Sequence, residues 1–217
     1  MSCQPFEYGL QPPAALFELA ASMRNAIEKM LVIDQPHEEL RRARREIDDI
    51  ARRLETIGRK GSRARMLPSV DPGPEDLRPY FAGDATRWHY NPLNPPLRLE
   101  VDAGVLRGTV TLGLAYEGPP GCAHGGFISM LLDQLLGQAN VLNGVPAMTA
   151  SLTVRYLRPT PLLTELSFEA QPPEMIEERK YVTRGCIRWG QEVTAEARGL
   201  FVFPNSAKFD LPDLSVP

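Results

Sequence analysis

The segment from Gly125 to Leu142 limits most strongly the folds open to this chain of 217 residues. A helix over this segment would carry apolar side chains around nearly its whole circumference. Such a helix has to be buried, so the rest of its domain must surround it. The apolar residues are Phe127, Ile128, Met130, Leu131, Leu132, Leu135, Leu136, Ala139, Val141 and Leu142.

On both sides of this helix the apolar residues follow a period of two, which predicts strands. One strand is expected to begin at Leu97 and to turn at Asp102-Ala103-Gly104, and a second continues from Leu106 to Tyr116. After the helix we expect the strands Thr149–Leu157, Thr164–Gln171, Glu178–Trp189 and Glu192–Phe203. Short connections between consecutive strands indicate an antiparallel sheet. The pattern therefore predicts an α+β domain in which an antiparallel sheet wraps around one long buried helix.

The N-terminal part has a different character, with helical spacing and almost no strand signal. One helix is expected from Pro13 to Val32, and a second begins with Asp34 as its cap and stops at Gly58. The stretch 59–80 is basic and then rich in proline, as in a linker. We therefore divide the chain into an extension with its linker (1–80) and a main domain (81–217). The second helix has a narrow apolar seam, and we expect this side to lie on the domain or on a neighbouring subunit. The residues of the seam are Leu40, Ala43, Ile47, Ile50, Leu54 and Ile57.

Composition excludes several classes of function. A net charge of −3 and a pI near 5.7 argue against nucleic acid as a partner. Cys3, Cys122 and Cys186 are far apart and odd in number, so neither a disulfide framework nor a metal site is expected. No signal peptide is recognised, and no apolar run approaches the ~20 residues of a membrane span. These features favour a cytoplasmic protein.

The residues before the buried helix form a glycine-rich run that ends in Gly121-Cys122-Ala123-His124-Gly125-Gly126. A helix start exposes unpaired N–H donors at its positive end, and these can stabilise a developing oxyanion. Asp133 lies inside the otherwise apolar helix, where an unpaired carboxylate costs several kcal/mol. Asp133 is therefore a satisfied core residue, a residue that faces a subunit interface, or a functional acid.

The spacing of His124 and Asp133 constrains any joint role. Asp133 follows His124 by nine residues, which is ~13 Å along a helix axis and two and a half turns around it. Two such residues face opposite ways and cannot act together within one chain. A site that uses both has to be formed by two chains, so catalysis would require at least a dimer.

The combination of His124-Gly125-Gly126, Asp133, Thr149 at the head of a strand and Arg158-Pro159 after it resembles the hotdog-fold acyl-CoA thioesterases. The nearest branch holds the phenylacetyl-CoA-pathway enzymes and the mammalian mitochondrial long-chain thioesterases. The resemblance covers about residues 90–203, whereas the N-terminal 80 residues match no family that we can name.

This resemblance implies a homodimer or homotetramer that hydrolyses acyl-CoA to a free acid and CoA, with no metal or organic cofactor. In relatives of this kind the Gly125 N–H would polarise the thioester carbonyl. Asp133 of the partner chain would act as nucleophile or as general base, and Thr149 would orient the water or the Asp. His124 would shape the helix start. Substrate-binding roles would fall to Gly126, Asn91 and Arg158. An Asn that some relatives carry before the glycine pair is missing from Tyr116-Glu117-Gly118.

Three other interpretations remain open. Cys122 and His124 suggest a nucleophile pair, although side chains two residues apart at a loop–helix junction diverge. Asp84 and His89 resemble the motif of hotdog enoyl-CoA hydratases, but they precede the first strand instead of following one. A non-catalytic hotdog dimer that binds acyl-CoA is the third. Arg155, Arg158, Arg179, Lys180 and Arg184 are candidate contacts for CoA phosphates.

Overall fold

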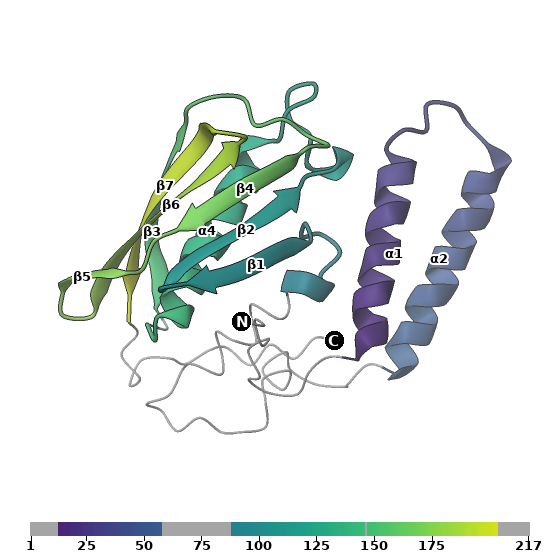
Figure 1. Cartoon of the computed structure of the whole chain (residues 1–217). Coiled ribbons are helices and arrows are strands. Elements are labelled where there is room, and N and C mark those ends of the chain that lie inside the picture. Colours follow the sequence, from purple (N-terminus) through teal and green to yellow (C-terminus); the bar gives the residue numbers. More distant parts are fainter. Residues whose placement is uncertain (1–12, 58–87, 146, 204–217) are drawn as a thin grey trace.

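A computed structural model of the chain describes residues 13–57, 88–145 and 147–203. Figure 1 shows a strongly bent sheet around one helix, with a helical hairpin beside it. The hairpin consists of α1 (Ala14–Met30) and α2 (Glu38–Ile57). The domain consists of β1 (Leu97–Asp102), β2 (Val105–Thr111), the short 3-10 helix η2 (Leu114–Tyr116), α4 (Gly125–Leu142), β3 (Met148–Tyr156), β4 (Glu165–Ala170), β5 (Glu174–Glu177), β6 (Lys180–Trp189) and β7 (Glu192–Val202).

The predicted antiparallel sheet is confirmed, because every pair of strands in it runs antiparallel. The order is β1-β2-β4-β6-β7-β3, and β5 pairs with β6 outside this path. Strand β3 follows α4 in the chain but lies at the far edge of the sheet, beside the last strand. The expected turn between β1 and β2 places Ala103 and Gly104 at positive φ (48° and 80°), as a type I′ hairpin requires.

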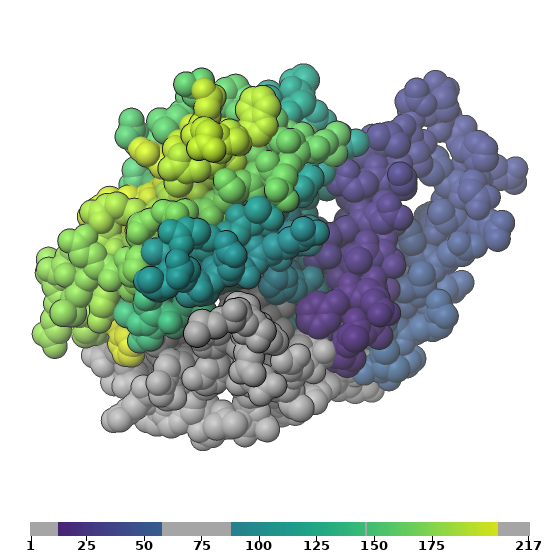
Figure 2. Space-filling view, viewed as in Figure 1, coloured from purple at the N-terminus to yellow at the C-terminus, as the bar shows by residue number. Residues whose placement is uncertain are grey.

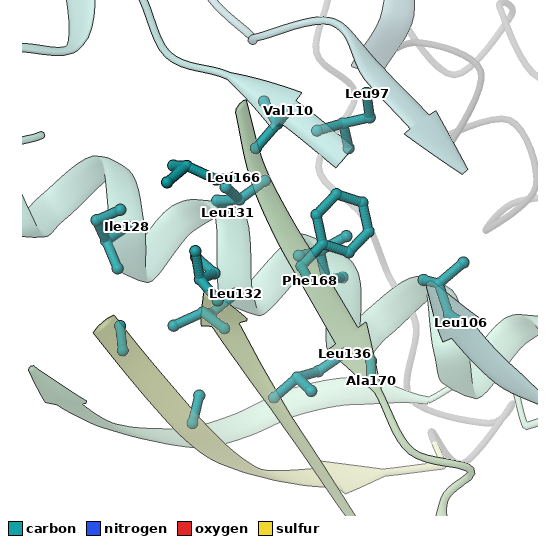
Figure 3. Close-up of a cluster of buried hydrophobic side chains, with 14 of the residues drawn as sticks. Leu97, Leu106, Val110, Ile128, Leu131, Leu132, Leu136, Leu166, Phe168 and Ala170 are labelled. Atoms are coloured by element: carbon teal, nitrogen blue, oxygen red, sulfur yellow. The ribbon is translucent and has the colours of Figure 1, made fainter. Parts of the chain in front are cut away.

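Helix α4 has the predicted bounds and supplies the centre of the core. Figure 3 shows its leucines between side chains from β1, β2 and β4. Leu106, Leu132, Leu136 and Leu166 have no exposed surface. Burial is not uniform around α4, however, because Ser129, Asp133 and Gly137 are only half-buried. The expectation of complete burial fails along this stripe, which the described chain leaves partly uncovered.

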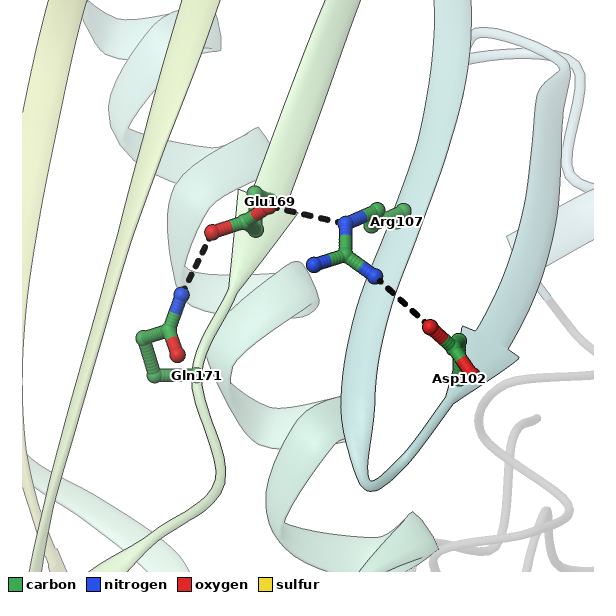
Figure 4. Close-up of polar contacts among 4 residues, drawn as sticks. All are labelled: Asp102, Arg107, Glu169 and Gln171. Atoms are coloured by element: carbon green, nitrogen blue, oxygen red, sulfur yellow. Dashed lines mark hydrogen bonds and ion pairs between the residues drawn. The ribbon is translucent and has the colours of Figure 1, made fainter.

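The outer face of the sheet is polar. Arg107 on β2 bonds to Glu169 on β4 at 2.8 Å and to Asp102 at 3.4 Å, and Gln171 donates to the same glutamate (Figure 4). Leu106 and Val110, which flank Arg107 and Thr109 along β2, are buried. This alternation is the period-two pattern read from the sequence, with its apolar side turned to α4.

Two strand predictions were wrong in detail. The second strand ends at Thr111, and Leu114–Tyr116 form the 3-10 turn η2, because the N–H groups of Leu114 and Ala115 bond to the Glu28 carboxylate on α1. The strand β5 was not predicted. It pairs with β6 across the tight turn at Arg179, which has φ of 66°.

The helical extension is confirmed where the structure describes it, and the linker 59–80 lies outside the described residues, as does the boundary at 80/81. Asp34 is not the cap of α2. The helix begins after His37, whose Nδ1 accepts the Glu39 N–H at 3.1 Å. In the space-filling view α1 lies against the domain and α2 forms the outer edge (Figure 2). No residue of α2 is buried, so its apolar seam is uncovered by the described part of the chain.

Candidate functional site

The start of α4 is capped by a histidine. His124 is the N-cap residue, with extended backbone (φ −66°, ψ 133°), and its Nδ1 accepts the N–H of Gly126 at 3.0 Å. A side-chain acceptor at this position satisfies one of the free donors of the first turn. The predicted shaping role of His124 at the helix start is therefore matched by a specific bond.

The two glycine amides of this first turn differ. The Gly126 N–H is taken by His124, whereas the Gly125 N–H donates to no atom in the described parts of the chain. Gly125 also adds no side chain beside this donor. Of the two glycines assigned to the site, Gly125 is thus the one with an available donor at the positive end of α4.

The loop before α4 is held by backbone bonds on both sides. The His124 N–H donates to the Tyr116 carbonyl at 2.8 Å, and the Ala123 N–H donates to the Thr160 carbonyl at 2.8 Å. Glu117 accepts the Gly121 N–H at 2.7 Å, where the chain reverses with φ of +74°. Glu117 therefore shapes the loop and does not stand in for the absent Asn.

Asp133 and Thr149 are in direct contact. The Thr149 hydroxyl donates to Asp133 Oδ1 at 2.9 Å, between the middle of α4 and the start of β3. No described residue bonds to the second oxygen, Oδ2. The carboxylate is therefore oriented by one bond and keeps an oxygen for a further partner, which a fully satisfied core aspartate would not.

A β-bulge aims Thr149 at α4. Thr149 pairs with Phe201 and Ser151 pairs with Leu200, so β3 has one extra residue, Ala150, at this point. Without it, Thr149 would face the side of the sheet opposite to Leu152 and Val154, which pack against the core. The extra residue shifts the alternation and turns Thr149 to the helix side.

Tyr156, at the other end of β3, contacts the helix start and was not recognised from the sequence. Its hydroxyl donates to the Gly125 carbonyl at 2.8 Å and lies 2.5 Å from Ser129 Oγ. A Cβ on Gly125 would meet the Tyr156 ring at 3.4 Å. A sequence signal existed, since Gly125 and Ser129 are four residues apart on a helix, but nothing indicated which strand residue would reach them.

Gly125, Ser129 and Asp133 thus form one stripe on α4 that faces β3. The prediction that His124 and Asp133 lie on opposite faces of the helix does not apply, because His124 is the non-helical cap. The predicted distance along the helix does apply, since eight residues place Asp133 about 12 Å from Gly125 along the axis. One substrate carbonyl cannot contact both groups in one chain. Gly137 continues this stripe one turn further, and a Cβ placed on it would meet nothing within 4 Å.

The other residues assigned to the site lie in separate places. Asn91 is in the turn before β1, where its side chain accepts the Leu93 N–H at 3.0 Å and its carbonyl accepts from Arg24 at 3.1 Å. Arg158 follows β3 and pairs with Glu192 at 3.1 Å. The other cations suggested for CoA phosphates also have partners, which are Glu196 for Arg155, Glu174 for Arg184, Glu177 for Lys180 and the Phe203 carbonyl for Arg179.

The competing pairs are not assembled as catalytic pairs. Cys122 Sγ bonds to no described residue, and the Nδ1 of His124 is used by the helix cap. Burial, and after it the charge of Arg24, lower the pKa of His89. Asp84 lies outside the described residues, so its geometry with His89 is untested. Among the described residues no group of three or more His, Cys, Asp or Glu side chains could hold a metal ion.

No described helix is both long and apolar enough to span a membrane.

Known proteins place this geometry in context. No family model matches the chain. Mouse (Mus musculus) acyl-coenzyme A thioesterase THEM4 is 38% identical over 103 residues, which are 45% of this chain and 44% of that protein. The frog (Xenopus laevis) protein of the same name is 39% identical over 92 residues, 42% of this chain and 41% of that protein. The chain spans less than half the length of these curated relatives.

Among solved structures, the crystal structure of a thioesterase superfamily protein is 32% identical, with a TM-score of 0.71, over 90% of this chain and 98% of that one. The PaaI protein of E. coli, from the phenylacetic acid degradation operon, is 20% identical with a TM-score of 0.51. That alignment covers 58% of this chain and 95% of PaaI, and it concerns the fold alone. The first likeness extends over too much of the chain to involve the main domain only.

Proposed function

This chain belongs to the thioesterase superfamily and has the hotdog fold, and on that basis we propose that it hydrolyses acyl-CoA thioesters to a free acid and CoA. The observation that carries the proposal is the state of two groups on α4. The Gly125 N–H is an unused donor at a helix start, and Asp133 is a carboxylate oriented by Thr149 with one oxygen unbound.

The active unit in this proposal is a dimer, with Gly125 of one chain facing Asp133 of the other. The separation of about 12 Å along α4 prevents both groups from reaching one carbonyl within a chain. The half-buried stripe of Ser129, Asp133 and Gly137 would be covered by the second copy. Strand β3 supports this, because it is an edge strand whose residues are largely exposed, and an open edge can pair with another chain. A tetramer of such dimers is compatible with the same site.

In the proposed reaction the Gly125 N–H binds the thioester oxygen as negative charge develops on it. With Asp133 as general base, the carboxylate takes a proton from water as the water oxygen attacks the carbonyl carbon. The tetrahedral intermediate then collapses, the carbon–sulfur bond breaks, and the proton passes to the leaving CoA thiolate. With Asp133 as nucleophile, its oxygen attacks the carbonyl carbon, the carbon–sulfur bond breaks, the CoA thiolate takes a proton from solvent, and water then hydrolyses the resulting anhydride. Label from isotopic water in Asp133 after a single turnover would demonstrate the second route, because the first route puts label only in the released acid.

No metal or organic cofactor takes part in this proposal, because a thioester is already activated and its thiolate is a good leaving group. Asn91, Gly126 and Arg158 remain proposed substrate contacts, and Arg158 would have to exchange Glu192 for a phosphate of CoA. We propose a cytoplasmic location, which is supported by the free thiols of the described cysteines, Cys122 and Cys186.

The proposal is tested by thiol release from acetyl-, long-chain and aryl-CoA substrates, with the wild type compared to Asp133→Asn. Loss of a general base or nucleophile should lower the rate by about 10²–10⁴-fold. Asp102→Asn is the matched control, since this exposed carboxylate lies on the outer face of the sheet. Its rate should equal that of the wild type, and all three proteins should have the same Tm.

Each alternative function has its own result. Retained thiol release in Asp133→Asn would remove the proposed role of this carboxylate. Acyl-CoA binding without thiol release from any substrate would identify a binding protein instead of an enzyme. Water addition to an enoyl-CoA, without release of thiol, would identify a hydratase.

A further inference from the structure

The N-terminal helix α1 is attached to the domain by two side chains one helical turn apart. Arg24 donates to the backbone carbonyls of His89 (2.7 Å), Asn91 (3.1 Å) and Asn94 (2.8 Å). Glu28 accepts the N–H groups of Leu114 (2.8 Å) and Ala115 (3.1 Å). All five bonds go to backbone groups, so α1 fixes the course of two segments and not merely the position of side chains.

The segment held by Glu28 leads directly to the candidate site. Leu114 and Ala115 open η2, and an acidic acceptor satisfies the free N–H groups at such a start. Tyr116, the last residue of η2, accepts the His124 N–H through its carbonyl at 2.8 Å. Its ring packs edge-on against Phe127 in the first turn of α4, with centroids 5.1 Å apart. Tyr116 is therefore tied to residues on both sides of Gly125.

The space for Glu28 is reserved by the domain. A Cβ on Gly113 would overlap the Glu28 carboxylate, so this side chain would have to move away. The backbone of Gly113 has φ of −85° and ψ of −172°, which any residue can adopt. Room for the Glu28 carboxylate is thus the feature that requires glycine here. Burial raises the pKa of the adjacent Tyr116 to about 12, so its hydroxyl carries no charge beside this carboxylate.

We propose that α1 braces the active site, with Glu28 as the positioning residue that fixes η2 and, through Tyr116, the peptide between His124 and Gly125. The proposal rests on the proposed function, because it assigns α1 to the placement of the Gly125 N–H. Helix α1 is then part of the catalytic apparatus, although it touches no substrate. In Figure 1 it lies between α2 and the domain, as such a brace must.

The test is a double-mutant cycle on the full chain, with kcat and KM measured for the best acyl-CoA substrate. Glu28→Ala removes the acceptor, and Gly113→Ala displaces it by filling its space. Each should lower kcat about tenfold, because misplacement of a reacting group by about 1 Å costs up to 10²-fold, and KM should stay nearly constant. The double variant should be no slower than Glu28→Ala, because both changes break one contact.

Two variants and one second measurement complete the design. Glu28→Gln keeps an acceptor oxygen and should recover part of kcat, whereas Glu18→Ala, an exposed carboxylate on the same helix, should change nothing. Amide hydrogen exchange of the segment 116–127 should be faster in Glu28→Ala than in the wild type, and this measurement does not depend on activity.

The outcomes separate the brace from the proposed function. An unchanged kcat in Glu28→Ala, or a double variant whose losses multiply, would overturn the brace while leaving the hydrolase assignment intact. If the wild type releases no thiol from any substrate, the hydrolase assignment falls. In that case unchanged amide exchange in Glu28→Ala overturns the brace as well, and faster exchange supports the structural coupling of α1 to the helix start.

Discussion

Helices α4 and α2 both carry regularly spaced apolar residues, yet α4 lies in the core and α2 lies at the surface. Leu132 on α4 has no exposed surface, whereas Leu54 on α2 is 38% exposed and Ile57 is 78% exposed. The two helices differ in how much of their circumference is apolar. Apolar residues surround α4, so a sheet has to enclose it, while α2 carries one narrow seam and a charged remainder. An apolar pattern in the sequence predicts that a helix forms and which of its sides is apolar. It does not predict whether other parts of the molecule cover that side.

Helix α1 is intermediate and shows what attaches a helix with few buried residues. Ala20, at 2% exposed, is the one buried residue among residues 13–30, and Met23 and Met30 are open to solvent. It is nevertheless fixed by Arg24 and Glu28, which bond to backbone groups of the domain. Two charged residues, together with an apolar side that is partly buried and includes Phe17 against Tyr90, therefore distinguish α1 from α2.

The largest effect is expected from equal substitutions in the two contrasting helices. Leu132→Ala should lower the free energy of unfolding by about 2–5 kcal/mol, because it leaves a cavity in the core. Leu54→Ala should change it by less than about 0.5 kcal/mol, because this side chain is already hydrated. Urea unfolding at one fixed protein concentration measures both. A Leu54→Ala loss near that of Leu132→Ala would mean that the seam of α2 is covered in solution, and the contrast would fail.

A smaller effect is expected when α1 loses the Arg24 bonds that attach it to the domain and so becomes as weakly attached as α2. Arg24→Ala removes three partly buried bonds from a charged donor to backbone carbonyls and should cost about 2 kcal/mol. Limited proteolysis should then cut within residues 14–30, which the wild type protects. Arg41→Ala, an exposed arginine on α2, serves as the control and should leave both stability and cleavage unchanged. Equal cleavage of the Arg24→Ala and wild-type proteins would show that other contacts hold α1.

The smallest effect is expected in the pH dependence of stability and concerns His89, whose carbonyl accepts a hydrogen bond from Arg24. Burial, and then the charge of Arg24, lower the pKa of His89, so the folded chain binds a proton there less readily than the unfolded chain does. Stability should therefore fall as the pH drops below the ordinary value of about 6.5. Thermal unfolding from pH about 7.5 to about 5.5 should show a shallower decline in His89→Gln than in the wild type. Equal slopes in the two proteins would exclude His89 as a source of the decline.

Much of the fold could be predicted from the sequence because it follows from local periodicity. The bounds of α4 and the antiparallel sheet needed only the pattern of apolar residues. The strand after Gly104 was extended too far, because Leu112, Leu114 and Tyr116 keep the alternation of a strand while their backbone turns. No local rule could show that the Leu114 N–H bonds to a carboxylate 86 residues earlier.

For the site, residue type and spacing indicated Gly125 and Asp133, the family resemblance added Thr149, and the structure brings the last two into contact. It did not indicate the bulge at Ala150 or the contact of Tyr156 with the helix start. The caps of α2 and α4 were also hidden, because both are histidines, and acceptors at this position are more often Ser, Thr, Asp or Asn.

By itself, then, the sequence determined most of the helices and strands, though not β5 or η2, and it indicated that α4 must be enclosed and that a glycine-rich helix start and a carboxylate share that helix. Only the tertiary structure decided that Thr149 donates to Asp133, that Tyr156 donates to the Gly125 carbonyl, and that Glu28 accepts the first N–H groups of η2. The reason is physical. Helices and strands arise from neighbours within a few residues, whereas these bonds join groups 16, 31 and 86 residues apart, and only the folded domain with α1 against it brings such groups within hydrogen-bonding distance.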